Sequence, residues 1–321
     1  MQLVRDSARA GWTEFRLPEP TALDAVGTLA AYEAMRRLLP ENAPRKTDKI
    51  DSLTSLIDSV DAFILDGYGV INVGEHIVPG FKAFLSEAYA ANRPVIILTN
   101  GASHASSTRA IKYQSWGLDI KAEQIVSSRD AFVDMIKAEG ENTRLMSLDG
   151  QTSPLGFENE LRFDGSLDSL EQADAFVMLG ATGWNAVHNA LLIEALNAKP
   201  RPLYIANPDI SAPQDIRFST EPGFWALEIM QATGQLPIWA GKPHRLAYEL
   251  ALNRLEKLTG TKVVHDRIAM VGDSLHTDIL GANHMGLKSV LLTGYGLLKG
   301  LDWKSLTEMT GIHPDFQTAQ L

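Results

Sequence analysis

The chain has 321 residues, of which 45% are hydrophobic, and its 29 basic and 39 acidic side chains give a net charge of −10. This length and composition predict roughly two domains, each with an apolar core of its own. The acidic balance disfavours binding of nucleic acid through its phosphates. The absence of cysteine excludes disulfides, thiolate catalysis and zinc–thiolate sites.

Hydropathy predicts neither a membrane span nor a leader sequence. There is no run of about 18 apolar residues, and the first seven residues have no apolar stretch and already include Asp6. We therefore expect a cytoplasmic protein that does not associate with membranes.

The first 50 residues differ in pattern from the rest of the chain. Residues 21–39 read as an amphipathic helix, and the polar stretch 40–47 follows it. We expect residues 1–50 to be an amino-terminal helical extension and linker, packed on the core or on the second subunit of a homodimer.

From residue 51 onward, short apolar runs alternate with segments of helical period, which is typical of βα units in a parallel sheet. The pattern predicts strands at 62–65, 95–98, 144–148, 175–179, 203–206, 268–271 and 289–292. It predicts helices at 81–91, 106–116, 131–138, 185–196, 224–233, 245–258 and 277–285. The fold class is therefore α/β.

Polar side chains follow three of the predicted strands. Asp66, Thr99 and Asp273 each stand at or directly after a strand end. Ligands of an open parallel sheet bind beyond the carboxyl ends of its strands, so we expect these side chains to converge on one point.

Asp66 is the candidate nucleophile. A carboxylate that attacks phosphorus divides one difficult displacement into the formation and the hydrolysis of an aspartyl phosphate. Gly67 and Gly69 beside it would let the backbone approach a phosphate closely and present amide donors. Taken alone, an aspartate at a strand end is equally compatible with a turn or a helix cap.

Two further segments carry candidate phosphate-binding groups. The hydroxyl of Thr99 and the amides of Asn100 and Gly101 could hold non-bridging phosphate oxygens, although the same residues also suit a strand-to-helix turn. Lys242, between Gly241 and Pro243, could neutralise the nucleophile and the transferred group, although a lysine at this place could also be a solvated charge.

Asp273 and Asp278 are candidate metal ligands. Mg²⁺ prefers hard oxygen ligands and takes only one or two protein carboxylates. Asp66 and the backbone carbonyl of Tyr68 would complete the protein's share. The alternative is that Asp273 caps the helix that follows and Asp278 complements its dipole.

Four segments in this order resemble the motifs of the haloacid dehalogenase superfamily of hydrolases. They are 66–70, 99–100, 241–243 and 272–282. Val78-Pro79-Gly80, Ala206-Asn207-Pro208-Asp209 and the long insertion between the second and third motifs are similar to the branch with 4-nitrophenyl phosphatase, pyridoxal phosphate phosphatase and a nucleotide phosphatase.

The resemblance implies a Rossmann-like parallel-sheet core at 51–142 and 207–321 with an α/β cap inserted at 143–206. It implies that Asp66 is the nucleophile, that Thr99 and Lys242 hold the phosphate, and that Asp66 and Asp273 bind Mg²⁺ beside Asp278. The substrate would be a small phosphorylated metabolite.

Tyr68 departs from the family pattern, in which phosphatases usually carry a second aspartate that acts as acid and base. A tyrosine has an ordinary pKa near 10 and is a poor base at neutral pH. Three functions therefore stay open: a phosphatase with Tyr68 as an altered catalytic group, a protein that binds phosphorylated ligands with little turnover, and a metal-independent dehalogenase.

Overall fold

The larger sheet of the protein is parallel throughout. The computed structural model describes residues 1–140, 143–214 and 217–321, and within them this sheet has seven strands in the order β1-β16-β15-β14-β2-β5-β6. Their bounds are Asp48–Lys49 (β1), Phe316–Thr318 (β16), Lys288–Leu292 (β15), Ile268–Gly272 (β14), Ala62–Leu65 (β2), Val95–Thr99 (β5) and Ile125–Ser127 (β6).

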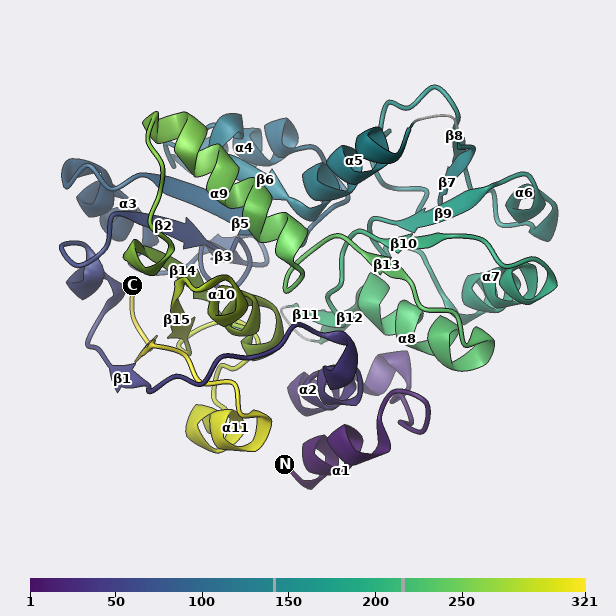
Figure 1. The fold of residues 1–321 in the computed structure, drawn as a ribbon, viewed down its shortest axis with the longest axis horizontal. Coiled ribbons are helices and arrows are strands. Elements are labelled where there is room, and N and C mark those ends of the chain that lie inside the picture. Colours follow the sequence, from purple (N-terminus) through teal and green to yellow (C-terminus); the bar gives the residue numbers. More distant parts are fainter. Residues whose placement is uncertain (141–142, 215–216) are drawn as a thin grey trace.

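Helices cover both faces of this sheet (Figure 1). Along β2, Phe63 and Leu65 join the apolar cluster of one face, whereas Ile64 joins the cluster of the other. The first cluster includes residues of α3 (Phe81–Ala90) and α4 (Ser106–Ser115), and the second includes residues of α5 (Ser128–Glu139), α9 (Arg245–Thr259) and α10 (Leu280–Met285). Because alternate side chains face opposite ways, burial on both faces explains why the central strands are continuous apolar runs.

A second parallel sheet lies beside the first. Its strand order is β13-β10-β9-β7-β8. The bounds are Ile238–Trp239 (β13), Leu203–Ile205 (β10), Ala175–Met178 (β9), Leu145–Ser147 (β7) and Glu160–Arg162 (β8), and the associated helices are α6 (Leu167–Glu171), α7 (Ala186–Ala198) and α8 (Pro222–Thr233). This is the right-hand part of Figure 1.

The second sheet extends beyond the segment predicted for the cap. The strand β13 pairs with β10, and α8 packs beside α7, although both α8 and β13 follow residue 206. A parallel strand can be added to a sheet edge from a distant part of the chain, and no local pattern signals that pairing. The domain boundaries at 50, 142 and 206 stay a prediction.

The amino-terminal segment differs from its prediction. It forms α1 (Gln2–Ala10) and α2 (Ala25–Ala34), and in α2 every residue from Gly27 to Ala34 is buried. A helix therefore lies within the predicted segment 21–39, but the prediction was wrong about its length and its amphipathic character. Leu29 and Tyr32 belong to an apolar cluster that also includes residues of α8 and of the segment 275–280, which follows β14. The helix α2 therefore contacts both sheet regions.

Among its described residues, the structure also contains two short hairpins and one π-helical turn. The hairpins are β3–β4 (Asn72–Val73 and His76–Ile77) and β11–β12 (Ser211–Pro213 and Phe218–Thr220). Residues Leu275–Ile279 form a π-helical turn before α10, at the start of the helix predicted at 277–285. The helix α11 (Trp303–Thr310) follows β15 in the chain.

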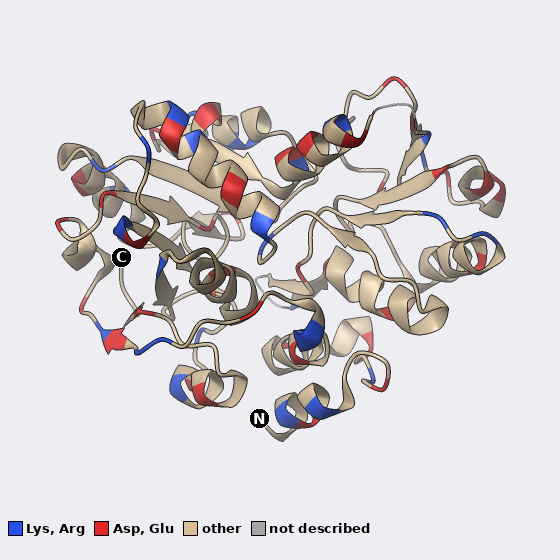
Figure 2. Cartoon of the chain, in the orientation of Figure 1, with Lys and Arg blue, Asp and Glu red and all other residues tan. Residues whose placement is uncertain are grey.

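Acidic and basic residues are interspersed on the outer helices (Figure 2). On α9, for example, Arg245 and Glu249 form an ion pair of 2.6 Å one turn apart. Within the described part of the chain, none of the helices has both the length and the apolar character needed to cross a bilayer.

Candidate active site

Three adjacent strands deliver the candidate groups to one edge of the larger sheet. The strand β2 ends directly before Asp66, β5 ends at Thr99, and β14 ends directly before Asp273. Since β14, β2 and β5 are parallel neighbours, their carboxyl ends lie side by side. The predicted convergence of these three residues is found in the structure.

Lys242 lies between two of the aspartates. Its Nζ is 2.8 Å from Oδ1 of Asp66 and 2.5 Å from Oδ1 of Asp278, and the side chain is only 2% exposed. Asn100 fixes the lysine's backbone, because its Oδ1 accepts from Lys242 N at 2.7 Å and its Nδ2 donates to Lys242 O at 3.1 Å. Lys242 is thus not a solvated surface charge.

Asp66, Asp273 and Asp278 form a buried cluster that could hold a metal ion. Each offers a carboxylate oxygen, and these oxygens lie within 4.8 Å of one another. Both oxygens of Asp278 accept hydrogen bonds, from Lys242 Nζ and from Ser274 N. Oδ2 of Asp66 and Oδ1 of Asp273 have no protein donor among the described residues, so these two oxygens are the best placed to bind a cation.

The electrostatics of the cluster also favour a cation. Three carboxylates face one ammonium group. Burial raises the pKa of Asp66 to about 7, because the opposing effect of Lys242 is smaller. The pKa of Asp273 is raised well above its usual value, first by burial and then by Asp66 and Asp278. Since burial and like charge both disfavour ionisation here, a divalent ion would compensate charge that Lys242 alone does not.

Two glycines hold the carboxyl group of Asp273 closely. Gly69 and Gly296 have φ angles of +82° and +69°, and a Cβ atom on either would overlap this carboxyl group. A side chain would therefore be strained at both positions and would displace a candidate metal ligand.

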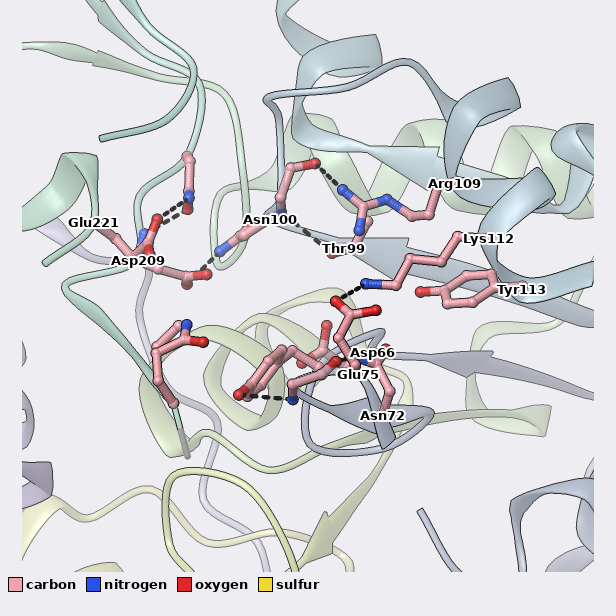
Figure 3. A pocket seen from close by; sticks show the side chains of 16 residues that line it. Asp66, Asn72, Glu75, Thr99, Asn100, Arg109, Lys112, Tyr113, Asp209 and Glu221 are labelled. Carbon is pink, nitrogen blue, oxygen red and sulfur yellow. Dashed lines mark hydrogen bonds and ion pairs between the residues drawn. The ribbon is translucent and has the colours of Figure 1, made fainter. Parts of the chain in front are cut away.

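A cavity of about 280 Å³ opens above Asp66 and Thr99 (Figure 3). Thr99 is 5% exposed and its Oγ1 accepts from Gly101 N at 3.2 Å. Two cationic side chains of α4, Arg109 and Lys112, line the wall near these residues, and Lys112 is paired with Glu75 at 2.7 Å. The cavity can therefore surround an anion with donors.

Tyr68 joins two hairpins at the rim of this cavity. Its hydroxyl donates to the carbonyl of Pro213 in β11 and accepts from Gly74 N, in the β3–β4 turn, at 3.1 Å. The hydroxyl proton is thus already engaged by a backbone carbonyl.

The segment after β10 adds a further group of polar residues. Asp209 accepts from Asn100 Nδ2 at 2.8 Å through Oδ1, and Asn207 donates to Glu221 at 3.2 Å. Burial raises the pKa of Asp209 to about 6 and that of Glu221 to about 7. Tyr32, from α2, lines a smaller cavity of about 50 Å³ together with Asp66.

The structure brings most of the predicted site residues together. Asp66 and Thr99 line the larger cavity, and Asp66, Lys242 and Asp273 line the smaller one. Asp278 belongs to the same carboxylate cluster as Asp66 and Asp273. The side chain of Asn100 mainly holds the backbone of Lys242, and its amide nitrogen also reaches Asp209. What each residue does in a reaction stays a prediction.

Sequence reasoning missed Tyr32, Arg109 and the position of Asp209. Arg109 is one turn into α4 and faces back toward the end of β5, where its Nη2 donates to Gly101 O at 3.1 Å. Asp209 follows a predicted strand end by three residues, which is a signal that the prediction could have used. For Tyr32 no local signal exists, because only tertiary packing brings α2 to the site.

Two parts of the chain match family models of hydrolases. A family model described as haloacid dehalogenase-like hydrolase matches residues 63–162, and one described as HAD-hydrolase-like matches residues 239–305. The acid sugar phosphatase of Staphylococcus aureus is 24% identical over 247 residues, which are 76% of this chain and 91% of that protein.

Solved structures have the same fold. One from Cytophaga hutchinsonii, described as a possible sugar phosphatase of the HAD superfamily, is 25% identical, with a TM-score of 0.75 over 86% of this chain and 98% of that one. The 4-nitrophenylphosphatase of Thermotoga maritima is 23% identical, with a TM-score of 0.66 over 83% of this chain and 96% of that one, a likeness that concerns the fold alone.

Proposed function

Since this chain belongs to the haloacid dehalogenase-like hydrolases, we propose that it is a Mg²⁺-dependent phosphatase of small phosphorylated metabolites. Membership of this superfamily and an α/β fold are as predicted from the sequence. The observation that carries the proposal is the buried cluster of Asp66, Asp273 and Asp278 around Lys242, at the carboxyl ends of parallel strands. Named phosphatases among its relatives support it.

Asp66 is the nucleophile in this proposal. Its Oδ1 accepts from Gly67 N at 2.7 Å and pairs with Lys242 at 2.8 Å, so the carboxylate has a fixed orientation. Its Oδ2 is left for attack on phosphorus or for a metal ion. Such preorganisation lowers the barrier because the reacting oxygen need not be reoriented.

Donors around Asp66 hold the phosphoryl group. The hydroxyl of Thr99, the ammonium of Lys242 and the amide of Asn100 are the groups that we assign to this role. The amides of Gly67 and Gly101, which were also predicted for it, donate instead to Asp66 Oδ1 and Thr99 Oγ1. Charge develops on the phosphoryl oxygens and on the leaving oxygen during transfer, and fixed donors in a buried site stabilise it strongly.

The residues present fit Mg²⁺. A carboxylate oxygen of Asp66 other than the one that attacks phosphorus and the free oxygen of Asp273 would provide the one or two carboxylate ligands that this ion usually takes from a protein. Asp278 stands beside them, and we assign the backbone carbonyl of Tyr68 as a further ligand. When bound, the ion would neutralise charge on the phosphate and on the carboxylates. Without the ion, Lys242 alone compensates the negative charge of the three carboxylates.

The metal cluster weighs against the dehalogenase alternative, because displacement of halide needs no divalent ion. Binding of a phosphorylated ligand with little turnover is favoured by one observation, the engagement of the Tyr68 hydroxyl by Pro213. That alternative predicts that inorganic phosphate with Mg²⁺ raises the melting temperature while no ester is hydrolysed.

A panel of phosphate esters, assayed with Mg²⁺ and with EDTA, tests the proposal. Phosphate release should require Mg²⁺ and should be lost in Asp66→Asn. Equal release by this variant and by the unchanged protein would remove Asp66 as nucleophile. Metal-independent release of halide from haloacids would support the dehalogenase instead.

The proposal also covers the class of substrate, the location in the cell and the oligomeric state. We assign a small-molecule substrate rather than nucleic acid or membrane, because the net charge of −10 repels polyanions and the candidate donors are confined to one cavity. A cytoplasmic location and a homodimer remain predictions, which fractionation of cells and light scattering of the purified protein would test.

A further inference from the structure

Hydrolysis of an alkyl phosphate through Asp66 needs a second group that gives and takes a proton. The leaving oxygen must be protonated, and the water that attacks the aspartyl phosphate must be deprotonated; such help is worth about 10²- to 10⁴-fold in rate. Tyr68 does not meet this need, because its hydroxyl donates to Pro213 O and a phenol is a poor base at neutral pH.

Among the residues that the structure describes, three carboxyl groups line the cavity besides the metal cluster. Glu75 is paired with Lys112 and its side chain is 75% exposed. Both oxygens of Glu221 are in use, since Oε1 accepts from Ser219 and Oε2 from Asn207. They are therefore poorly placed for proton transfer to a substrate on Asp66.

Asp209 is different in its hydrogen bonding. Its Oδ1 accepts from Asn100 at 2.8 Å and from the Tyr32 hydroxyl at 3.5 Å, whereas Oδ2 has no donor among the described residues. Asp209 lines both cavities that Asp66 lines. One oxygen is thus anchored while the other is left for a proton transfer, in a residue that lines the same two cavities as the nucleophile.

The backbone around Asp209 is fixed from two directions. Asp209 N donates to Asn207 Oδ1 at 3.0 Å, and Ile210 N donates to the Tyr32 hydroxyl at 3.2 Å. The Tyr32 ring stacks on His276, with centroids 5.0 Å apart and an angle of 7°. The buried helix α2 therefore orients Asp209, which explains why an amino-terminal segment reaches the site.

Within the described part of the chain, the charged and titratable groups facing Asp209 are Lys242, Asp66, Asp278, Glu221 and the Tyr32 phenol. Burial raises the pKa of Asp209 to about 6, although Lys242 and the bonds from Asn100 and Tyr32 oppose the shift. Both protonation states are then accessible near neutral pH, as an acid and base requires.

We infer that Asp209 is the general acid and general base of this site and that Tyr32 is its positioning residue. This inference rests on the proposed function. In the first step Asp66 Oδ2 bonds to phosphorus, the bond from phosphorus to the leaving oxygen breaks, and that oxygen takes its electron pair and the proton of Asp209. In the second step ionised Asp209 takes a proton from water, the water oxygen bonds to phosphorus, and Asp66 leaves as a carboxylate.

Two esters with different leaving groups test the assignment. Asp209→Asn keeps an oxygen that can accept from Asn100 but cannot transfer a proton. It should lower kcat/KM for glycerol phosphate by about 10²- to 10⁴-fold, and for 4-nitrophenyl phosphate, whose leaving group needs no protonation, by less than about tenfold.

Two further variants sharpen the result. Glu221→Gln, the matched change in the same cavity, should alter both esters by the same factor. Tyr32→Phe keeps the ring on His276 but removes a bond that lowers the pKa of Asp209, so the corresponding limb of the pH–rate profile for glycerol phosphate should move to higher pH. Asp209→Asn should remove that limb.

Equal losses on both esters in Asp209→Asn, or no loss on either, would overturn the inference, as would a selective loss in Glu221→Gln. The proposed function fails separately: Asp66→Asn would then hydrolyse both esters as fast as the unchanged protein, and the role of Asp209 would fall with it. An inactive Asp66→Asn beside an indifferent Asp209→Asn would reject only the inference.

Discussion

Lys242→Met should destabilise the protein strongly unless Mg²⁺ is present. The ammonium lies 2.8 Å from Asp66 and 2.5 Å from Asp278, and water cannot replace it because the side chain is 2% exposed. Removal of one partner from a buried ion pair costs about 3–5 kcal/mol. Since domains have only about 5–15 kcal/mol of stability, we expect a loss of this size to be a large part of the total.

The same charge argument predicts rescue by the metal. With the lysine gone, Asp66, Asp273 and Asp278 have no cationic ion-pair partner among the described residues, so a divalent ion becomes their main compensation. At a free concentration of about 100 times its Kd, a ligand that binds only the folded state adds about 2.7 kcal/mol. Mg²⁺ should therefore stabilise Lys242→Met.

Urea unfolding followed by the fluorescence of the 6 tryptophans measures both effects. Each variant is unfolded in EDTA and in Mg²⁺. Lys262→Met is the matched control, because Lys262 pairs with Glu256 at 2.8 Å but is 91% exposed, and it should not differ measurably from the unchanged protein. If Lys242→Met in EDTA were within about 1 kcal/mol of the unchanged protein, the buried ion pairs would be absent in solution.

Three further outcomes follow from the same cluster. Mg²⁺ should raise the melting temperature of the unchanged protein but not of Asp273→Asn, in a thermal titration; equal shifts would exclude Asp273 as a ligand. The Cβ of Gly296→Ala would overlap the carboxyl group of Asp273, so this variant should bind Mg²⁺ more weakly in calorimetry. Gly300→Ala is the control: its φ is also positive, at +78°, but its Cβ would have no neighbouring atom within 4 Å, so it should only lose stability. Equal affinities of the two variants for Mg²⁺ would refute the close packing around Asp273. The raised pKa of Asp66 means that folding takes up a proton, so the contribution of Asp66 to stability is complete below about pH 4 and is lost as pH rises through about 7. The metal-free protein should therefore unfold at a lower urea concentration above about pH 7 than near about pH 4, and Mg²⁺ should reduce the difference. A series of urea unfolding curves at different pH values would check this.

The large sheet was predictable because its central strands are buried on both faces. Runs such as Ala62–Leu65 and Val95–Thr99 are continuous and apolar, and helices separate them in the chain. Short strands at or next to a sheet edge, such as β13 and β16, have no such pattern. Their pairing depends on distant parts of the chain, and so does the position of α2, whose small residues pack on all sides.

The candidate site was predictable where residues follow strand ends. Asp66, Thr99 and Asp273 are of this kind, and parallel topology alone brings them together. Tyr32 could not be placed in this way, whereas Asp209 follows a predicted strand end by three residues and could have been. They meet because α2 and the segment after β10 pack against one another, a contact between residues far apart in the sequence.

Chemical trapping of the phosphorylated enzyme tests the central claim most directly. A reaction with 4-nitrophenyl phosphate and Mg²⁺ is quenched in its first turnovers and treated with borohydride, which reduces an acyl phosphate to an alcohol. Peptide mass spectrometry should then find homoserine at position 66, and only there. Recovery of unmodified Asp66 with hydrolysis in progress, or homoserine at another aspartate, would contradict the account.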